Sequence, residues 1–302
     1  MRDMCYLPEY IGRNNLLRRI IPERCRYKIK SAIHISKLHK FLYLWGAMSN
    51  KIEFLGTGTS QGMPIIGCRC PVCRSDDFHD KRLRTSAYIE YEGLRLVIDA
   101  GPDFRQQILR SGIMELDAVL LTHMHKDHTG GLDDVRAFNY FMHRAFPVYA
   151  EPLVQESLKR EYSYAFGDHR YPGVPDFTLH TIGEEPFCIN GIEIIPVRAM
   201  HYKLPILGFR FGRLGYLTDA NYISEESIER FRGVDIFVVS CIRRTPHISH
   251  FSLDEAIEVC RRVGARHCFL THLSHQLEKY EDLCKTLPEG IEPAYDGLSL
   301  TF

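Results

Sequence analysis

Alternating hydrophobic and polar positions mark several short segments of the chain as strands. The clearest segments are residues 51–56, 86–91, 94–99, 192–197, 208–211 and 214–218. Glu92-Gly93 separates the second from the third, and such a pair is typical of a two-residue hairpin turn. The pattern predicts strands in both halves of the chain.

Three other runs are hydrophobic apart from their end residues: residues 118–122, 236–240 and 267–271. Such runs suit strands that are buried on both faces. Helix patterns lie between the strands: one after Pro102, one over 224–231 behind a Ser cap, and one over 252–263. The last opens with a capping box, Ser252 to Glu255. We therefore predict an α/β fold, an αββα sandwich with two mixed sheets face to face and helices outside.

Charge is divided unevenly along the 302 residues, although it sums to zero. Residues 1–47 hold ten of the 38 Lys and Arg but three of the 38 Asp and Glu, a net +7, which leaves −7 for the remainder. We predict a basic extension over residues 1–47 and one domain over residues 48–302. The extension is either a disordered or loosely helical segment, or not native, with the true start at Met48. The acidic body disfavours nucleic acid as a partner.

No hydrophobic run approaches the roughly 20 residues that a membrane-spanning helix needs. Residues 41–45 are too short for a signal peptide, and no small-residue cleavage site follows them. We expect a cytoplasmic protein without membrane contact. Of ten cysteines, three lie within residues 68–73. In a reducing compartment such spacing indicates metal binding before disulfides.

The sharpest feature follows the run at 118–122. Four metal-ligand side chains fall within six residues: His123, His125, Asp127 and His128. Imidazole suits zinc and iron, and carboxylate extends the range to manganese. Gly130-Gly131 comes next and predicts a tight turn into a helix. The alternative is a polar surface loop with chance histidines.

Three further ligand-type residues stand at the ends of other strand patterns. They are His201, Asp219 and His272. Each alone is weak, because a single histidine after a strand is more often structural. Together with the first four they make seven ligands, enough for two metals with positions left open for water and substrate.

A second metal site is predicted at Cys68, Cys70 and Cys73. Tetrahedral structural zinc needs a fourth ligand, and His275, three residues after His272, is the best candidate. Such a zinc would fasten the cysteine loop to the edge of the first site. The alternative is three reduced cysteines on a loop.

With these motifs the sequence resembles the metallo-β-lactamase superfamily over nearly all of residues 51–302. The resemblance implies that one metal is held by His123, His125 and His201. It implies a second metal on Asp127, His128 and His272, with Asp219 bridging the two. Asp99 matches the position that orients a ligand histidine. Two divalent ions, zinc or manganese, would make hydroxide available near neutral pH and stabilise charge on an attacked phosphoryl or carbonyl oxygen.

Residues 56–64, the cysteine loop and residues 270–275 together resemble the PhnP-like phosphodiesterases. That resemblance implies hydrolysis of a small cyclic or linear phosphodiester, with one structural zinc beside the active site. His250 matches the family's histidine before the last long helix, where it would protonate the leaving group or bind the phosphate, and it is favoured over His247. Asp127 and Asp219 are assigned to catalysis with it. The alternative for His250 is a helix cap or core histidine, and Arg243 and Arg244 are either phosphate contacts or surface charges.

Other functions remain open at this point. A ribonuclease Z-like tRNA 3′-processing enzyme shares the ligand set, and the basic residues 1–47 favour it. A thiolesterase or lactonase would use the same water on carbonyl carbon. A scaffold protein would lack ligands, and all seven are present. The aromatic stretch over residues 139–177 forms a lid, a homodimer face, or helices packed on the sheet.

Overall fold

The computed structural model describes residues 50–167, 171 and 173–302. The predictions about residues 1–47 lie outside this part of the chain. Within it, strands and helices alternate along the chain as the hydrophobic pattern predicts. Two seven-stranded sheets result, and each places an antiparallel half beside a parallel half.

The first sheet has, in spatial order, β14 (Ser299–Thr301), β1 (Lys51–Gly56), β2 (Ser86–Tyr91), β3 (Leu94–Ile98), β4 (Ala118–Leu120), β5 (Phe146–Ala150) and β6 (Phe177–Thr181). Strands β3 to β6 run parallel to one another. The predicted hairpin is confirmed, and both residues of its turn have positive φ, 50° at Glu92 and 89° at Gly93.

The second sheet has, in spatial order, β13 (Ile291–Pro293), β12 (His267–Thr271), β11 (Ile236–Ser240), β10 (Leu214–Leu217), β9 (Leu204–Phe211), β8 (Ile192–His201) and β7 (Phe187–Ile189). Strands β10 to β13 are parallel, while β7 to β10 are antiparallel. Strand β8 is longer than predicted, and His201 is its last residue rather than a residue beyond it.

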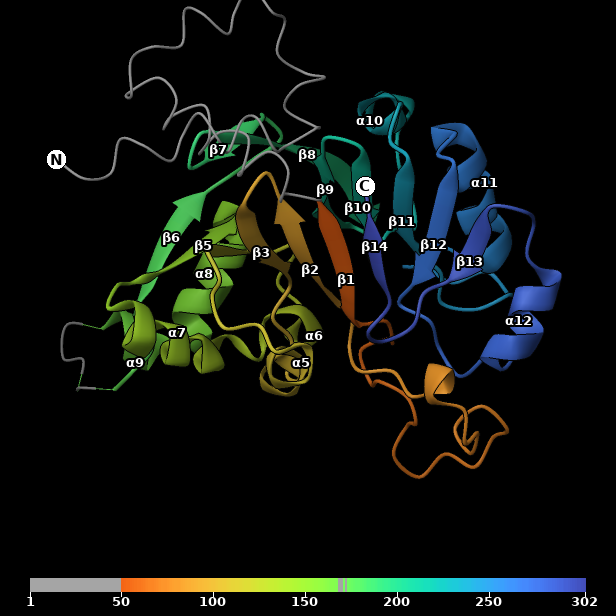
Figure 1. The fold of residues 1–302 in the computed structure, drawn as a ribbon, viewed down its shortest axis with the longest axis horizontal. Coiled ribbons are helices and arrows are strands. Elements are labelled where there is room, and N and C mark those ends of the chain that lie inside the picture. The colour runs from red at the N-terminus through yellow and green to blue at the C-terminus, as the bar shows by residue number, and fades with distance from the viewer. Residues whose placement is uncertain (1–49, 168–170, 172) are drawn as a thin grey trace, which may run out of the picture. The chain divides into compact units, whose positions relative to one another are not determined.

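Helices cover the outer faces of the two sheets, as Figure 1 shows. They are α5 (Phe104–Ser111), α6 (Lys126–Thr129), α7 (Arg136–Met142), α8 (Pro152–Glu161), α9 (Ser163–Phe166), α10 (Glu225–Phe231), α11 (Leu253–Val263) and α12 (Tyr280–Thr286), with 3-10 turns η1 (Phe78–Asp80) and η2 (Leu132–Val135). The capping box of α11 is formed as predicted. Its buried residues Leu253, Ala256, Ile257, Cys260 and Val263 follow the 3.6-residue period of a helix.

Three hydrophobic clusters correspond to the layers. One fills the space between the sheets and includes Phe54, Phe209 and Tyr216. The others lie between each sheet and its helices. The predicted αββα sandwich is confirmed. No helix among the described residues has both the length and the apolar character needed to cross a bilayer.

The aromatic stretch over residues 139–177 divides between packing and exposure. Tyr162 is buried, and its hydroxyl donates to the Thr129 carbonyl (2.7 Å). Tyr140 and Phe141, on α7, remain exposed. Packing of α7 and α8 against β5 and β6 accounts for the first group, while a lid or homodimer role for the second stays a prediction.

Candidate metal centre

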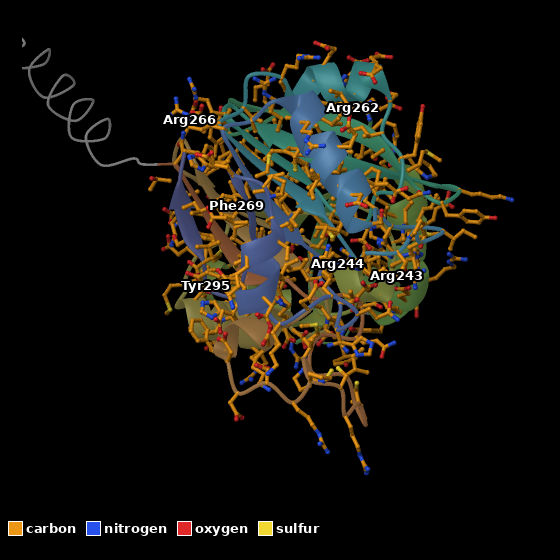
Figure 2. The ribbon with its side chains drawn as sticks, turned by 90° about the vertical axis from the view of Figure 1, so that its right-hand side faces the viewer. Arg243, Arg244, Arg262, Arg266, Phe269 and Tyr295 are labelled. Atoms are coloured by element: carbon orange, nitrogen blue, oxygen red, sulfur yellow. The ribbon has the colours of Figure 1, made fainter. Side chains whose placement is uncertain are left out.

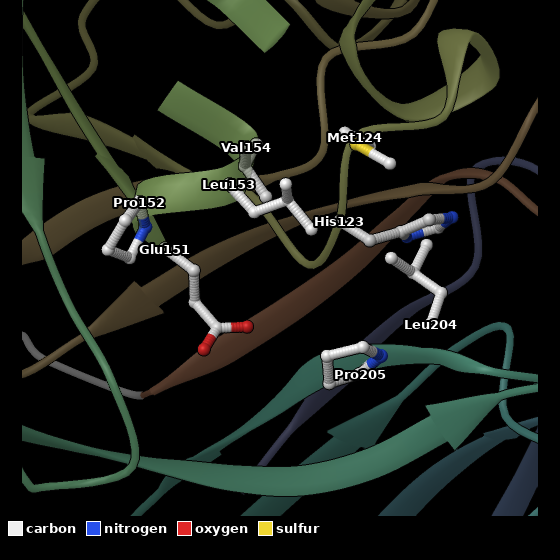
Figure 3. A pocket seen from close by; sticks show the side chains of 8 residues that line it. All are labelled: His123, Met124, Glu151, Pro152, Leu153, Val154, Leu204 and Pro205. Carbon is white, nitrogen blue, oxygen red and sulfur yellow. The ribbon is translucent and has the colours of Figure 1, made fainter. Parts of the chain in front are cut away.

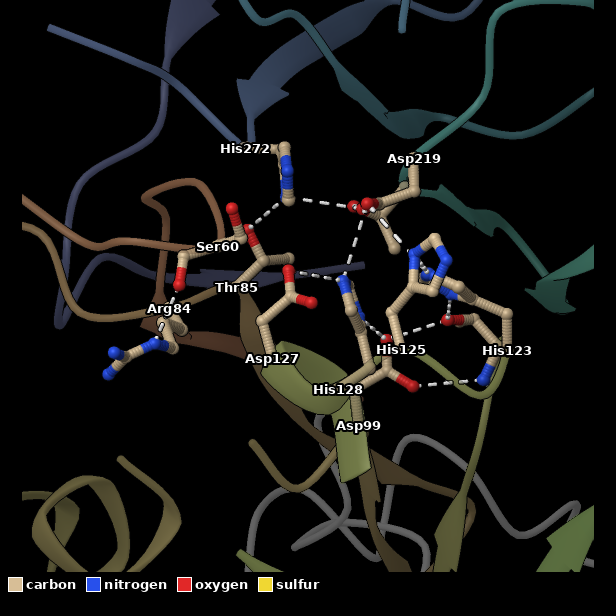
Figure 4. Close-up of polar contacts among 12 residues, drawn as sticks. Ser60, Arg84, Thr85, Asp99, His123, His125, Asp127, His128, Asp219 and His272 are labelled. Carbon is tan, nitrogen blue, oxygen red and sulfur yellow. Dashed lines mark hydrogen bonds and ion pairs between the residues drawn. The ribbon is translucent and has the colours of Figure 1, made fainter. Parts of the chain in front are cut away.

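The predicted ligands meet where parallel strands of both sheets end. Asp99 directly follows β3, and His272 directly follows β12. Asp219 follows Thr218, the first residue after β10. Asp99, Asp219 and His272 all have positive φ (62°, 58° and 57°). Such a backbone is strained for residues other than Gly and, where it clusters, commonly marks a functional site. The turn at each strand end directs these side chains toward a common point (Figure 4).

His123, His125 and His201 form the first group, with their ligand atoms all within 4.8 Å of one another. His123 Nε2 lies 3.1 Å from His125 Nδ1. Two nitrogens bound tetrahedrally at about 2.0–2.1 Å from zinc would be roughly 3.3 Å apart. This spacing therefore suits two nitrogens that share one ion.

Asp127, His128, Asp219 and His272 form the second group. His128 Nε2 is 3.2 Å from Asp127 Oδ2 and 3.4 Å from Asp219 Oδ2. His272 Nδ1 lies 3.1 Å from Asp219 Oδ1. Asp219 also faces the first group, because its Oδ2 is 3.9 Å from His123 Nε2. Of the seven predicted ligands, Asp219 is thus the one positioned between the groups.

Hydrogen bonds around the histidines determine which nitrogens face inward. His128 Nδ1 donates to Asp99 Oδ2 (2.6 Å). The Thr122 hydroxyl also donates to Asp99 Oδ2 (2.8 Å), so its oxygen accepts from His123 Nδ1 (2.9 Å). His201 Nδ1 donates to the Ser249 carbonyl (2.7 Å). In each ring the proton is held on Nδ1, which leaves the lone pair of Nε2 for an ion.

The charges around the second group also favour the binding of a cation. His128 Nε2 is buried and has no hydrogen-bond partner among the described residues. Burial lowers the pKa of His128, but Asp219, Asp99 and Asp127 outweigh it and raise that pKa well above its usual range. Burial and the adjacent His128 lower the pKa of His123 well below its usual range. Positive charge is therefore favoured between the carboxylates, where a divalent ion would supply it.

His250 lies beside this cluster, and its buried Nδ1 is 4.0 Å from Asp219 Oδ2 and makes no hydrogen bond to the described residues. Its ring lies 4.6 Å from that of His201 and 4.9 Å from that of His272. Burial lowers the pKa of His250 to about 3, so its ring is neutral near pH 7. His247 lies farther out, and its Nδ1 accepts from the Ser249 backbone (3.3 Å).

Arg262 and Arg266 lie at one end of the second sheet, and Arg243 and Arg244 lie toward its other end (Figure 2). Arg243 donates to the carbonyls of Thr245 and Pro246. Arg244 is paired with Glu278. Both guanidinium groups therefore stabilise the loop before His250.

Two glycine positions allow the ligand segment to lie against β3. A Cβ at Gly101 would be 1.9 Å from the Asp127 carbonyl oxygen, and one at Gly131 would be 1.9 Å from that of Gly101. Gly130 (φ −69°, ψ −6°) and Gly131 (φ −105°, ψ 5°) make the predicted turn into η2, but φ values of this sign do not themselves require glycine. Close backbone approach is what requires glycine here.

The cysteine loop converges as predicted. Cys68, Cys70, Cys73 and His275 offer ligand atoms within 4.8 Å of one another, and His275 Nδ1 is 3.2 Å from Cys68 Sγ and 3.5 Å from Cys70 Sγ. Burial raises the pKa of Cys70, but hydrogen bonds from the Cys73 backbone and His275 outweigh it and lower that pKa to about 6. The set is that of a tetrahedral zinc site.

Sequence reasoning missed the residues that orient the ligands. Thr85 lies 3.2 Å from His272 Nδ1, and its own hydroxyl donates to the Gly58 carbonyl. Thr122 could have been noticed because it directly precedes His123. Nothing in the sequence marks Thr85 or Ser249, since their roles depend on contacts between distant segments.

Comparisons with known proteins agree with this architecture. A family model described as a beta-lactamase superfamily domain matches residues 94–273. The structure is similar to that of a new diphosphatase from the PhnP family, with 40% identity and a TM-score of 0.79, over 84% of this chain and 98% of that one.

Two curated relatives carry different names. The chain is 43% identical over 247 residues to an octanoyltransferase of Porphyromonas gingivalis; the match covers 81% of this chain but 50% of that protein. The chain thus spans about half the length of this relative. It is 38% identical over 226 residues to the anti-Pycsar protein Apyc1 of Bacillus phage 010DV004, covering 67% of this chain and 87% of that protein.

Proposed function

Because this chain belongs to the metallo-β-lactamase superfamily and is a metal-dependent hydrolase, we propose that it cleaves small cyclic or linear phosphodiesters with two divalent ions, zinc or manganese. The ions would be held by the two groups of the metal centre, with Asp219 between them. The name of the similar diphosphatase, whose substrate also contains phosphoryl groups, supports the phosphoryl class.

One observation carries the proposal: His128 Nε2 is buried between two carboxylates and makes no hydrogen bond to any of the described residues. A buried nitrogen without a partner costs roughly 1–3 kcal/mol, and a divalent ion would remove that cost. Ions bound there would supply Lewis-acid polarisation and acidify a bound water. The protein supplies fixed tautomers through Asp99 and Thr122, so that the ligands need no rearrangement.

His250 would act on the substrate rather than on the ions. Its Nδ1 makes no hydrogen bond to the described residues and lies 4.0 Å from Asp219 Oδ2, so a phosphate bound to the centre would come close to this ring. The negative charge of that phosphate would raise the pKa of His250 from about 3 and favour the protonated ring. We assign to it the proton that the leaving oxygen receives.

The four residues of the cysteine loop site would hold a structural zinc. His275 lies three residues beyond His272, and the intervening Leu273 donates its backbone N–H to the Thr57 carbonyl (2.9 Å). A zinc on this set would keep the loop against the segment that carries His272. Its contribution would be to position that ligand.

The test is turnover of metal-loaded protein against cyclic phosphodiesters, bis-aryl phosphodiesters, an octanoyl thioester and a lactone, together with metal content. We expect phosphodiester cleavage with three metals per chain, two of which a chelator removes with loss of activity. Thioester or lactone cleavage without phosphodiester cleavage would contradict the proposal. The octanoyl thioester is included because of the relative's name, although that activity can reside in the half this chain does not match.

A second candidate, a ribonuclease Z-like tRNA-processing enzyme, rests on the +7 charge of residues 1–47. A tRNA-binding assay over a range of salt concentrations, on the full chain and on a version lacking these residues, separates the two functions. Electrostatic binding would weaken steeply with salt and depend on the segment. Equal and negligible binding by both proteins favours the small-substrate enzyme.

A further inference from the structure

A cavity of about 210 Å³ opens beside the first group of ligands. His123 lines it directly (Figure 3). Leu204 lines it too, and pairs with His201 across the β8–β9 hairpin. The opposite wall is the first turn of α8, where Leu153 and Val154 contribute their side chains. The cavity is therefore attached to the metal centre through two of its ligands.

The walls are mainly apolar, and the charged group among them is already paired. Leu153 is 44% exposed, so part of its side chain is free to contact a ligand. Glu151 lies at one side, and Arg198 binds both of its carboxylate oxygens. Arg198 also contacts Glu184 (3.0 Å). Among the described residues lining the cavity there is no Lys or Arg that could form an ion pair with an anion.

The size of the cavity limits what can enter. A cavity of roughly 150 Å³ lined by apolar side chains is enough to hold benzene. A volume of about 210 Å³ accommodates one aromatic ring with a small substituent, but not two rings with a second phosphate. An uncharged ring would bury its faces against Leu153, Leu204 and Pro205.

We propose that this cavity is a specificity pocket that binds an uncharged aromatic ring, of the size of an aryl group or a single-ring base, on one arm of the substrate. This inference rests on the proposed function, because the phosphate at the metal centre is what brings the arm to the pocket. The metal centre would then bind the phosphoryl group, and the pocket would determine which substituent on that group is accepted.

Binding of simple phosphonates tests the pocket apart from turnover. Phenylphosphonate and methylphosphonate carry the same group for the metals and differ in the ring. Calorimetry on metal-loaded protein should show phenylphosphonate binding about 10- to 50-fold more tightly, from burial of the ring at ~25 cal/mol per Å². 4-Carboxyphenylphosphonate should lose most of this advantage, because its carboxylate would leave water for mainly apolar walls that offer no Lys or Arg as a partner.

Leu153→Asn keeps the size of the side chain and makes the wall polar. It should lower the phenyl-to-methyl ratio at least about threefold, since the apolar wall contributes part of the ring's burial. Leu109→Asn is the matched control, because Leu109 is also an exposed helical leucine (64%) but lies on α5, outside the pocket. The control should leave the ratio unchanged.

Two results overturn the pocket alone: equal binding of both phosphonates to the wild type, or an unchanged ratio in Leu153→Asn. Absence of phosphodiester turnover with retained preference for the phenyl compound would instead overturn the proposed function and leave the pocket standing. Failure to bind either phosphonate would overturn both.

Discussion

Replacing Asp99 by Asn should move the ring proton of two histidines, His128 and His123, from Nδ1 to Nε2. Asp99 Oδ1 accepts from the Thr122 backbone N–H (2.9 Å), which cannot turn away. The new amide must therefore keep its oxygen there and place its NH₂ where Oδ2 was. That NH₂ meets two donors, His128 Nδ1 and the Thr122 hydroxyl. Neither donor can keep its present hydrogen bond, because an NH₂ group cannot accept one.

The consequence reaches both groups of ligands. His128 moves its proton to Nε2, the nitrogen that faces the second metal position. The Thr122 hydroxyl turns to donate to His123 Nδ1, which moves the proton of that ring to Nε2 as well. Loss of one orienting partner commonly weakens metal binding about 10- to 100-fold. Because two ligands change together, we expect the upper end, about 100-fold or 2.7 kcal/mol.

Chelator competition gives the metal affinity, and ¹⁵N chemical shifts of His123 in metal-free protein, where its lowered pKa keeps the ring neutral, give its tautomer. Asn tolerates the positive φ of this position, so the fold should persist and thermal unfolding should confirm it. Asp117→Asn is the control: Asp117 accepts from the Arg95 backbone (2.8 Å) just before β4, at the end of that strand away from His123. An affinity within threefold of wild type, with His123 still protonated on Nδ1, would refute the reasoning.

Further changes test other parts of the molecule. His250→Ala should slow cleavage of phosphodiesters with poor leaving groups at least about 100-fold and hardly affect those with nitrophenol; equal losses in kcat for both would exclude the acid role. In metal-free protein at pH 7, Cys70, with its pKa of about 6, should react with iodoacetamide before the other cysteines, and zinc should protect it; peptide mapping decides. Gly131→Ala should destabilise the fold by about 3 kcal/mol or more, because its Cβ would lie 1.9 Å from the Gly101 carbonyl, and an unchanged unfolding midpoint would contradict this. Burial raises the pKa of Tyr162 to about 12, so the unfolded chain loses that proton first and stability falls from pH 10 to 12; Tyr162→Phe should reduce that fall in urea unfolding.

The sequence allowed the ligands to be predicted because each stands at the end of a hydrophobic run. His123, Asp219 and His272 follow short apolar segments, and such segments in parallel sheets end at one edge. The resemblance then divided them into two sets. The cysteine loop and His275 could be joined because tetrahedral zinc needs four ligands, and three were at hand.

Other features depend on contacts that no local pattern records. Strands β5, β6 and β7 went unpredicted, because β5 lies within an aromatic stretch that has no clear period, β6 begins at its last residue, and β7 follows. The positive φ of Asp99 is imposed by the Thr122 and His128 contacts around it. The pocket at Leu153 arises only when α8 meets the β8–β9 hairpin.

Each sheet lies in its own half of the chain apart from β14, which returns to the first. His123, His125, Asp127 and His128 therefore come from one half, and His201, Asp219 and His272 from the other. The cysteine loop and His275 are divided in the same way. Ions in these sites would connect the two layers. They would stabilise the folded protein by RT ln(1 + [M]/Kd), where [M] is the concentration of free metal. Removal of the metals should therefore weaken the contact between the two layers, while the hydrogen bonds within each sheet persist.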